Sequence, residues 1–210
     1  MTRQGKSGPA YRVETARLVV RCWEPQDAPL LNAAVIASWE HLSPWMPWAR
    51  GDRPSVEGTA AGLRRWRADF DRDEDYVYAI FSRDESVVLG STGLHTRRGE
   101  RVREIGYWIH VDHIGRGYAT EASAALTRVA FEVDRVHRVE IHCVPDNLRS
   151  AAVPRKLGFT HEATRREVLA EGDGTYRDAM VWTLLAGEYP TSPAASAEIA
   201  AYDVLGRRVL

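Results

Sequence analysis

The segment EIGYWIHVDHIGRGYATE, from Glu104 to Glu121, joins a strand pattern, a glycine loop and a helix start. Its apolar residues at 105, 107 and 109 alternate with other side chains, which is the period of a β-strand. Gly115 and Gly117 follow and allow the backbone to turn sharply close to a ligand. Beyond them, apolar residues recur at helical spacing as far as Val133. The pattern predicts a strand, a tight loop and a helix in direct succession.

The predicted junction is suited to a phosphate group. The first turn of a helix presents free N–H groups and the positive end of the helix dipole, and Arg116 adds a charge. A dinucleotide site is disfavoured because Thr120 stands where G-x-G-x-x-G has its third glycine. The residues therefore leave two interpretations, a nucleotide-containing cofactor or a glycine-rich turn without a ligand.

The loop resembles the acyl-CoA pyrophosphate loop of the GNAT acetyltransferases, Q/R-x-x-G-x-G/A, read here from Ile114 to Ala119. Ile114 departs from the first position, where the RimJ/RimL-type branch often has a large apolar residue. That branch acetylates the N-termini of ribosomal proteins. Further segments resemble it in the expected order, at residues 14–31, 41–48, 89–95, 145–159 and 176–185.

The resemblance implies a mixed α/β fold, with a mostly antiparallel central sheet, splayed middle strands and flanking helices. The predicted order of elements agrees with such a mixed sheet. Strands are predicted at 17–22, 76–82, 86–94, 103–111, 138–144, 162–169 and 176–185, the last two forming a hairpin around residues 171–174, and helices at 27–38, 55–70, 117–134 and shortly before Phe159. We expect a polar leader at 1–13, one domain at 14–189, and a tail at 190–210 that ends in a docking segment around 199–210.

Composition bounds the class of protein. A chain of 210 residues is long enough for one buried core, and a net charge of −1 gives no general attraction for nucleic acid or an anionic membrane. No apolar run is long enough for a membrane span, and the N-terminus lacks the apolar core of a secretory signal. Cys22 and Cys143 lie in apolar runs and are expected to be reduced, as in a cytoplasmic protein. The sequence does not distinguish a monomer from a homodimer.

The resemblance implies acetyl-CoA as the acyl donor, with its pantetheine arm between the splayed strands and no metal. Asn147 has a second interpretation as a helix N-cap, and the spacing of His110 and His113 is only weakly suggestive of zinc. The implied cofactor residues are Trp108, Ile109, His110 and Val111 on the strand edge, Gly115, Arg116, Gly117, Tyr118, Ala119 and Thr120 in the pyrophosphate loop, and Asn147 and Ser150.

Acyl transfer requires an unprotonated amine, which a general base or a chain of waters can supply. Glu104 matches the position of the catalytic glutamate in some GNAT members. Its alternative is a structural carboxylate paired with Arg101 or Arg103. His142 is the second candidate because histidine titrates near neutrality. The four arginines between 97 and 103 are otherwise expected to be a solvated hairpin, and residues 69–75 an acidic turn.

The departing thiolate needs a proton unless it leaves as the anion. Many relatives use a tyrosine where this chain has Pro154, so Ser150 is the nearest replacement, although it could only bind CoA. Pro154 is expected to delay or kink its helix. Backbone N–H groups near 109–111 are the expected donors to the tetrahedral oxyanion.

The acceptor site is expected in the segment that carries Trp45, Met46 and Trp48, whose aromatic side chains could wall a cleft or simply pack. Tyr107 is a further candidate, and Tyr176 and Asp178 are weaker ones. The resemblance implies direct acetyl transfer to a primary amine, preferably a peptide N-terminus. The alternatives are an antibiotic or polyamine-like amine, another acyl group such as succinyl, or a CoA-binding module without catalysis.

Overall fold

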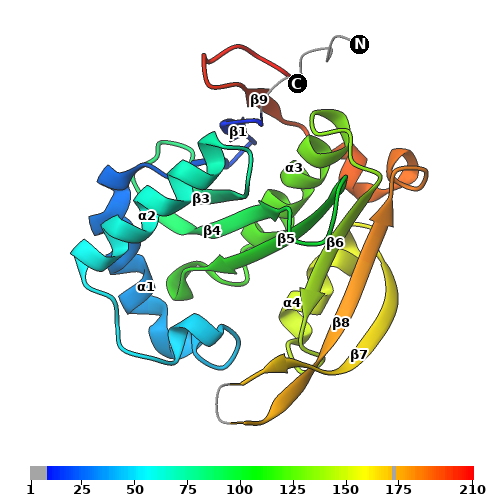
Figure 1. Cartoon of the computed structure of the whole chain (residues 1–210). Coiled ribbons are helices and arrows are strands. Elements are labelled where there is room, and N and C mark those ends of the chain that lie inside the picture. The colour runs from blue at the N-terminus through cyan, green and yellow to red at the C-terminus, as the bar shows by residue number, and fades with distance from the viewer. Residues whose placement is uncertain (1–8, 172–173) are drawn as a thin grey trace.

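The computed structural model describes residues 9–171 and 174–210. Within them a single sheet has the strand order β7-β8-β6-β5-β4-β3-β2-β1-β9 (Figure 1). The strands are β1 (Arg12–Glu14), β2 (Leu18–Cys22), β3 (Tyr76–Ser82), β4 (Val88–His95), β5 (Val102–Ile109), β6 (Arg138–Cys143), β7 (Thr160–Ala170), β8 (Tyr176–Leu185) and β9 (Ala200–Tyr202). The helices are α1 (Ala28–Leu42), α2 (Val56–Asp71), α3 (Tyr118–Glu132) and α4 (Leu148–Lys156).

The helices cover the two faces of the sheet and give it two separate cores. On one face, Leu94 and Ile105 pack with residues of α3 and α4 in the larger cluster. On the other face, Val19 and Phe81 pack with residues of α1 and α2. Alternate residues of each strand therefore serve opposite cores, as the period of a strand requires. The mixed α/β fold predicted from the sequence is confirmed.

The central strands β5 and β6 separate part of the way along the sheet. They are the one parallel pair among the described strands, and their pairing runs from Val102–Arg138 to Ile105–Ile141. β5 then continues to Ile109 against β4 alone, while β6 stays paired with β8 as far as Cys143. The gap between the two strands leaves backbone groups and space in the middle of the sheet.

Local signals explain where several elements begin and end. The side chain of Ser55 accepts the Gly58 N–H at 3.0 Å and caps α2, as predicted. β5 is shorter than predicted, because residues 111–113 form a 3₁₀ turn that His110 caps through its side chain. α4 begins directly after Asn147, so Pro154 does not delay its start.

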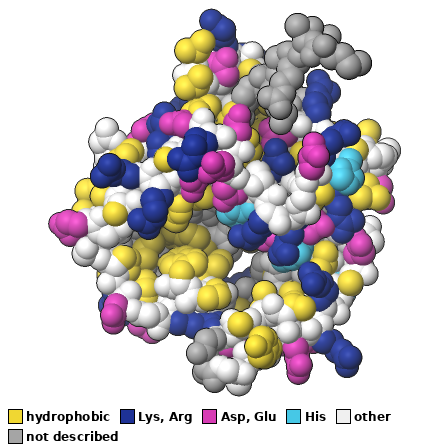
Figure 2. All heavy atoms as spheres, in the orientation of Figure 1, with side chains coloured by type: hydrophobic (Ala, Val, Ile, Leu, Met, Phe, Trp, Pro, Cys, Tyr) yellow, Lys and Arg dark blue, Asp and Glu magenta, His cyan; other side chains and the backbone are white. Residues whose placement is uncertain are grey.

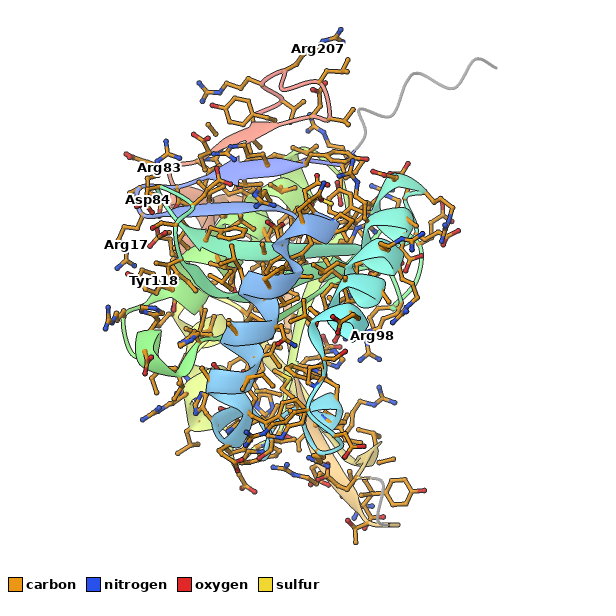
Figure 3. The ribbon with its side chains drawn as sticks, turned by 90° about the vertical axis from the view of Figure 1, so that its left-hand side faces the viewer. Arg17, Arg83, Asp84, Arg98, Tyr118 and Arg207 are labelled. Carbon is orange, nitrogen blue, oxygen red and sulfur yellow. The ribbon has the colours of Figure 1, made fainter. Side chains whose placement is uncertain are left out.

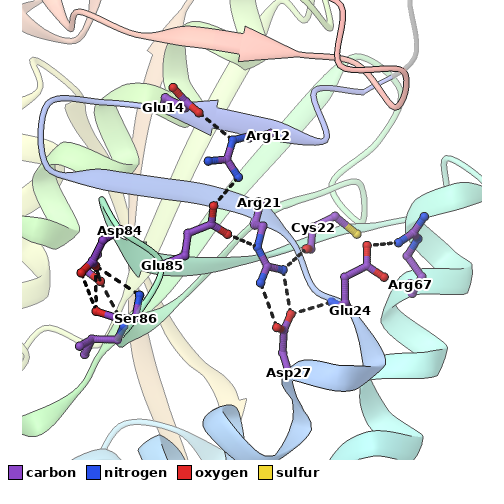
Figure 4. Close-up of polar contacts among 12 residues, drawn as sticks. Arg12, Glu14, Arg21, Cys22, Glu24, Asp27, Arg67, Asp84, Glu85 and Ser86 are labelled. Carbon is purple, nitrogen blue, oxygen red and sulfur yellow. Dashed lines mark hydrogen bonds and ion pairs between the residues drawn. The ribbon is translucent and has the colours of Figure 1, made fainter.

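An ion-pair network fixes α1 relative to the first strands (Figure 4). Arg21 on β2 makes a bidentate contact with Asp27, with N–O distances of 2.8 and 2.9 Å, immediately before α1. The same guanidinium also contacts Glu85, which in turn accepts from Arg12 on β1. Bidentate arginine–carboxylate contacts fix geometry as well as adding energy. The network therefore sets the direction in which α1 leaves the sheet.

Both ends of the described chain contribute strands that the sequence analysis did not predict. β1 pairs with β2 and β9, and Ala201 of β9 is fully buried. Between β8 and β9 the chain also packs on α3, where Tyr189 stacks on Phe131 at 4.7 Å between ring centroids. The first eight residues of the expected leader, and Gly172 and Asp173 of the predicted hairpin turn, lie outside the described residues.

Candidate active site

A cavity of about 780 Å³ lies where β5 and β6 separate. Its walls come from the end of β5, the start of α3, the start of α4, and the end of α1 with the loop that follows. It brings together most of the residues that the sequence analysis assigned to the cofactor and three assigned to the acceptor: Trp45, Met46, Tyr107, Trp108, Ile109, Gly115, Gly117, Tyr118, Ala119, Thr120, Asn147 and Ser150. Glu104, His142, His110, Val111, Arg116 and Trp48 are not among its lining residues.

The glycine loop adopts a backbone that other residues disfavour. Gly115 has φ +75° and Gly117 has φ +83°, both in the left-handed region that glycine enters without strain. A Cβ on Gly115 would meet no atom within 4 Å, so the backbone angle rather than crowding favours glycine there.

Gly117 is the N-cap of α3, and its carbonyl accepts the N–H of Glu121 at 3.0 Å. The amides of residues 118–120 therefore have no partner within the helix and lie at the cavity wall. Such an arrangement can bind an anion.

Arg17 on the β1–β2 turn holds this loop in place (Figure 3). Its guanidinium donates to the carbonyl of Arg116 at 3.0 Å, pairs with Glu121 at 2.5 Å, and lies 4.7 Å from the ring centre of Tyr118. Arg116 itself donates to the carbonyl of Asp112 and does not line the cavity. The sequence analysis missed Arg17, because nothing local indicates that residue 17 approaches residues 116–121.

Two hydroxyl groups meet on the opposite wall. The Tyr107 hydroxyl donates to the Ser150 carbonyl at 3.0 Å and lies 3.1 Å from the Ser150 hydroxyl. That carbonyl has no intrahelical partner, because the residue four positions on is Pro154, which has no N–H. Burial raises the pKa of Tyr107, so its phenol keeps its proton at neutral pH. Asn147 caps α4 by accepting the Ser150 N–H at 3.0 Å, as one of its two interpretations expected.

Two of the amides expected to act on the oxyanion, those of His110 and Val111, already have acceptors. The His110 N–H donates to the Leu89 carbonyl at 2.8 Å, and the Val111 N–H donates to the Ser38 hydroxyl at 3.1 Å. Both groups would have to leave these acceptors before they could bind a developing negative charge. His113, three residues beyond His110, lines the cavity, and burial lowers its pKa.

Glu104 lies outside the cavity in a charged cluster. Its side chain is buried, and both carboxylate oxygens accept from the neighbouring hairpin, with Arg97 at 2.5 Å from one oxygen and Arg98 on the other. Burial raises its pKa, but the contacts with Arg97, His142 and Arg98 outweigh burial and hold the pKa at about 2. A carboxyl group with that pKa is a weak base at neutral pH.

The partners of Glu104 are thus Arg97 and Arg98, and not Arg101 or Arg103. Arg103 pairs with Asp134 at 3.0 Å, and Arg101 reaches a backbone carbonyl. The arginine hairpin is therefore largely engaged in ion pairs rather than simply solvated. Sequence alone could not choose among four closely spaced arginines, since the twist of the hairpin decides which of them face Glu104.

His142 belongs to the same cluster. Its Nε2 lies 2.7 Å from a carboxylate oxygen of Glu140, and its Nδ1 lies 3.0 Å from the guanidinium of Arg98. A guanidinium can only donate, so Nδ1 accepts and Nε2 carries the proton. Both ring nitrogens are occupied, which leaves no lone pair for an acceptor amine. We name Glu104, His142, Glu140, Arg97 and Arg98 the charged cluster.

The tryptophan segment borders the cavity from the side of α1. Trp48 is 49% exposed and contacts Trp39 and Trp108, with ring centres 6.4 and 6.3 Å apart. Arg177 of β8 donates to the Pro44 carbonyl at 2.8 Å and lies over Trp45, so the loop is tied to the far end of the sheet. Figure 2 shows a hollow with hydrophobic side chains in its floor and basic and histidine side chains along part of its rim.

The two weaker acceptor candidates, Tyr176 and Asp178, do not line the cavity. Tyr176 is largely exposed, and Asp178 accepts the Glu167 N–H within the β7–β8 hairpin. His41 at the end of α1 does line the cavity, and the sequence analysis did not single it out. Burial, followed by the charge of Arg149, lowers the pKa of His41, so its imidazole is neutral at pH 7.

Residues 17–160 match the family model described as the acetyltransferase (GNAT) domain, which covers the separated strands, the glycine loop and α4. The chain belongs to the GNAT acetyltransferase family. It is therefore an acyltransferase, as predicted.

Two curated relatives of this GNAT protein match over most of their length. It is 30% identical over 173 residues to the putative ribosomal N-acetyltransferase YdaF of Bacillus subtilis, covering 82% of this chain and 93% of YdaF. It is 27% identical to the [ribosomal protein uS5]-alanine N-acetyltransferase of Escherichia coli, covering 84% and 91% of the two chains.

Solved structures of GNAT proteins have a similar fold. RimJ of Mycobacterium smegmatis in complex with CoA-disulfide superposes with a TM-score of 0.76 at 29% identity over 90% of each chain. RimL, the ribosomal L7/L12 α-N-protein acetyltransferase in complex with coenzyme A, has a TM-score of 0.73 at 22% identity, which supports the fold alone. It is matched over 81% of this chain and 95% of its own.

Among the described residues, no group of three or more His, Cys, Asp or Glu side chains is arranged to hold a metal ion. None of the described helices has the length and hydrophobicity that a membrane span requires.

Proposed function

We propose that this protein transfers an acetyl group directly from acetyl-CoA to a primary amine, with the N-terminus of a protein or peptide as the preferred acceptor. The observation that carries the proposal is the cavity at the strand separation, where unpartnered amides and a pair of hydroxyl groups face one space. The amides can bind a diphosphate, and the hydroxyl groups can lie beside a thioester.

The cavity fits coenzyme A in its chemistry. The amides of residues 118–120 and the positive end of the 15-residue helix α3 would bind the pyrophosphate. The edge of β5 at Trp108 and Ile109, which has no partner strand on the β6 side, would pair with the amide groups of the pantetheine arm. Asn147 and Ser150 would contact the same arm from α4.

The reaction would join the acceptor nitrogen to the acetyl carbon and break the bond from that carbon to sulfur. Ser150 and Tyr107 are the proposed proton donors to the departing thiolate, because their hydroxyls lie within 3.1 Å of each other on the cavity wall. Both cysteines are buried, and burial raises the pKa of each thiol. Neither is therefore suited to accept the acetyl group, which favours direct transfer.

A peptide acceptor is supported by two observations. The segment from Trp45 to Trp48 places Trp45 and Met46 at the cavity, and Trp48 is half exposed. Two relatives that match over more than 90% of their length bear names that refer to ribosomal acetylation or a ribosomal protein. A ribosomal substrate would also place the enzyme in the cytoplasm.

The proposal is tested by incubating the protein with acetyl-CoA and an acceptor panel, followed by mass spectrometry. The panel contains peptides with N-terminal alanine, serine or methionine, the same peptides with a blocked N-terminus, and spermidine. We expect a gain of one acetyl group on a free N-terminus and none on the blocked control. Acetylation of spermidine alone would overturn the peptide assignment, and no transfer to any amine by a protein that binds CoA would indicate a module without catalysis.

A further inference from the structure

His95, the last residue of β4, has a carboxylate partner and one unoccupied nitrogen. Its Nδ1 lies 2.8 Å from one oxygen of Asp75, whose other oxygen accepts the Thr96 N–H at 3.2 Å. Burial raises the pKa of Asp75, but the contacts with His95 and Thr96 outweigh burial and lower it, so Asp75 is ionised. A carboxylate can only accept, so Nδ1 carries the proton and Nε2 has the free lone pair.

The imidazole lies over two glycines of the sheet, which leave room for it because they carry no side chains. Gly93 on β4 and Gly106 on β5 are direct cross-strand partners. A Cβ added to Gly93 would come within 2.8 Å of Nε2, and one added to Gly106 within 3.3 Å. Any other residue at these two positions would displace the ring.

The direction of the ring follows from these contacts. Because Nε2 is the atom nearest to both glycine positions, the ring extends from His95 along β4 and β5 toward Trp108. Gly106 and Trp108 lie on the same face two residues apart, a spacing of about 7 Å. Trp108 lines the cavity and His95 does not, so the ring of His95 points along the strands toward the cavity wall that Trp108 forms.

Neither Glu104 nor His142, the two base candidates from the sequence, has an unoccupied acceptor atom. Both oxygens of Glu104 accept from arginines, and both ring nitrogens of His142 are occupied. No described residue hydrogen-bonds to Nε2 of His95, and its side chain is 17% exposed. Nε2 is therefore partly accessible, and no hydrogen bond within the described residues occupies it.

We propose that His95 is the general base for the acceptor amine and that Asp75 is its positioning residue. This inference rests on the proposed acetyl transfer. As the nitrogen–carbon bond forms and the carbon–sulfur bond breaks, Nε2 takes the proton that the amine nitrogen loses. The products are the N-acetylated acceptor and the CoA thiolate, which takes a proton from the cavity hydroxyls. The imidazolium then releases its proton to solvent, and solvent returns one proton to the hydroxyl that lost it.

Several charged groups surround the imidazole. Asp75 contacts it, and Glu104 is its cross-strand neighbour on β5, where Arg97 and Arg98 pair with that carboxylate. On the preceding loop, Glu74 is paired with Arg72. We expect an acidic limb in the pH dependence of kcat/KM, because only the unprotonated imidazole can act as a base.

The test compares the His95→Asn variant with wild type in acetyl transfer to an alanine-N-terminal peptide. Asparagine can keep the contact with Asp75 but has no base. We expect kcat to fall at least about 100-fold with the acidic limb lost and the Kd for CoA unchanged within about twofold. The matched control is His137→Asn, an exposed histidine before β6, which should behave as wild type.

Asp75→Asn provides the second readout. Loss of the carboxylate removes the negative charge beside the imidazole, so the acidic limb should move to lower pH while a smaller kcat remains. A purely structural role for Asp75 would reduce activity without moving the limb. An active wild type whose His95→Asn variant keeps kcat within about threefold, with its acidic limb, would overturn the inference alone. A wild type that transfers acetyl to no acceptor would instead overturn the proposed function, and the inference with it.

Discussion

The glycine loop and the charged cluster flank opposite ends of β5, and they differ in what fixes them. The loop at residues 114–120 depends on backbone angles and helix geometry, both encoded within a few residues. The charged cluster depends on which side chains from β5, β6 and a hairpin meet in space. A binding site built from backbone can be predicted from a short motif, whereas one built from tertiary contacts cannot.

The comparison predicts that the charged cluster is structural and that its loss lowers stability rather than catalysis. Glu104→Gln should lower the free energy of unfolding at pH 7 by about 3 kcal/mol, because a buried carboxyl with a pKa of about 2 becomes neutral beside two arginines. Urea unfolding measures this effect. In the remaining folded protein, kcat should stay within about threefold of wild type.

The sign of the pH dependence follows from the lowered pKa of Glu104. Its stabilisation is present above the unfolded pKa of roughly 4.3 and disappears as the pH falls toward 2. The difference between wild type and Glu104→Gln should shrink over that range. The control is Glu162→Gln, an exposed partner of Arg138, which should change stability by no more than about 0.5 kcal/mol. If kcat fell 100-fold in a stable Glu104→Gln protein, Glu104 would be the base, and the structural role expected for the charged cluster would be wrong.

For the glycine loop we expect the opposite result: a substitution should weaken CoA binding and change the stability little. Gly115→Ala should weaken CoA binding about tenfold, or about 1.4 kcal/mol, because alanine disfavours φ +75° and the amides would shift. Titration calorimetry with CoA measures the change. Gly206→Ala is the matched control, since Gly206 has φ +72° and equally open surroundings far from the cavity. Equal CoA affinity in both variants would show that the loop angle does not matter for binding.

Arg17 sharpens the comparison, because it adds a tertiary contact to the local motif. Arg17→Ala should weaken CoA binding about threefold, since the loop keeps its glycines but loses the contact with the Arg116 carbonyl. The control is Arg83→Ala, an arginine on the same side of the molecule that pairs with Glu14 (Figure 3). It should leave the affinity unchanged, and an equal loss in both variants would indicate a general effect of charge.

The sequence predicted most of the central sheet and all four helices, because their periodicities and caps are local. Ser55, Asn147 and the glycines of the loop are positions where one residue type determines a turn or a helix end. β1 and β9 were missed because three-residue strands carry almost no periodic signal.

The residue that acts as the base for the acceptor amine was harder to predict from the sequence. Glu104 and His142 suit a base by residue type and position, but their availability depends on Arg97, Arg98 and Glu140. His95 was overlooked for the same reason, since its contact with Asp75 joins residues 20 positions apart across a strand pair. Lone histidines on strands offer no sequence signal that separates a free nitrogen from an occupied one.

The central claim is that the cavity at the strand separation binds acyl-CoA. The most direct measurement is thermal unfolding in parallel with acetyl-CoA, free CoA, succinyl-CoA and NAD. At about 100 times Kd, a ligand bound only by the folded state adds roughly 2.7 kcal/mol, which raises Tm by about 5–10 °C for a chain of this size. We predict a shift with the CoA species and none with NAD. No shift with any CoA species, from protein shown by mass spectrometry to carry no bound ligand, would contradict the account.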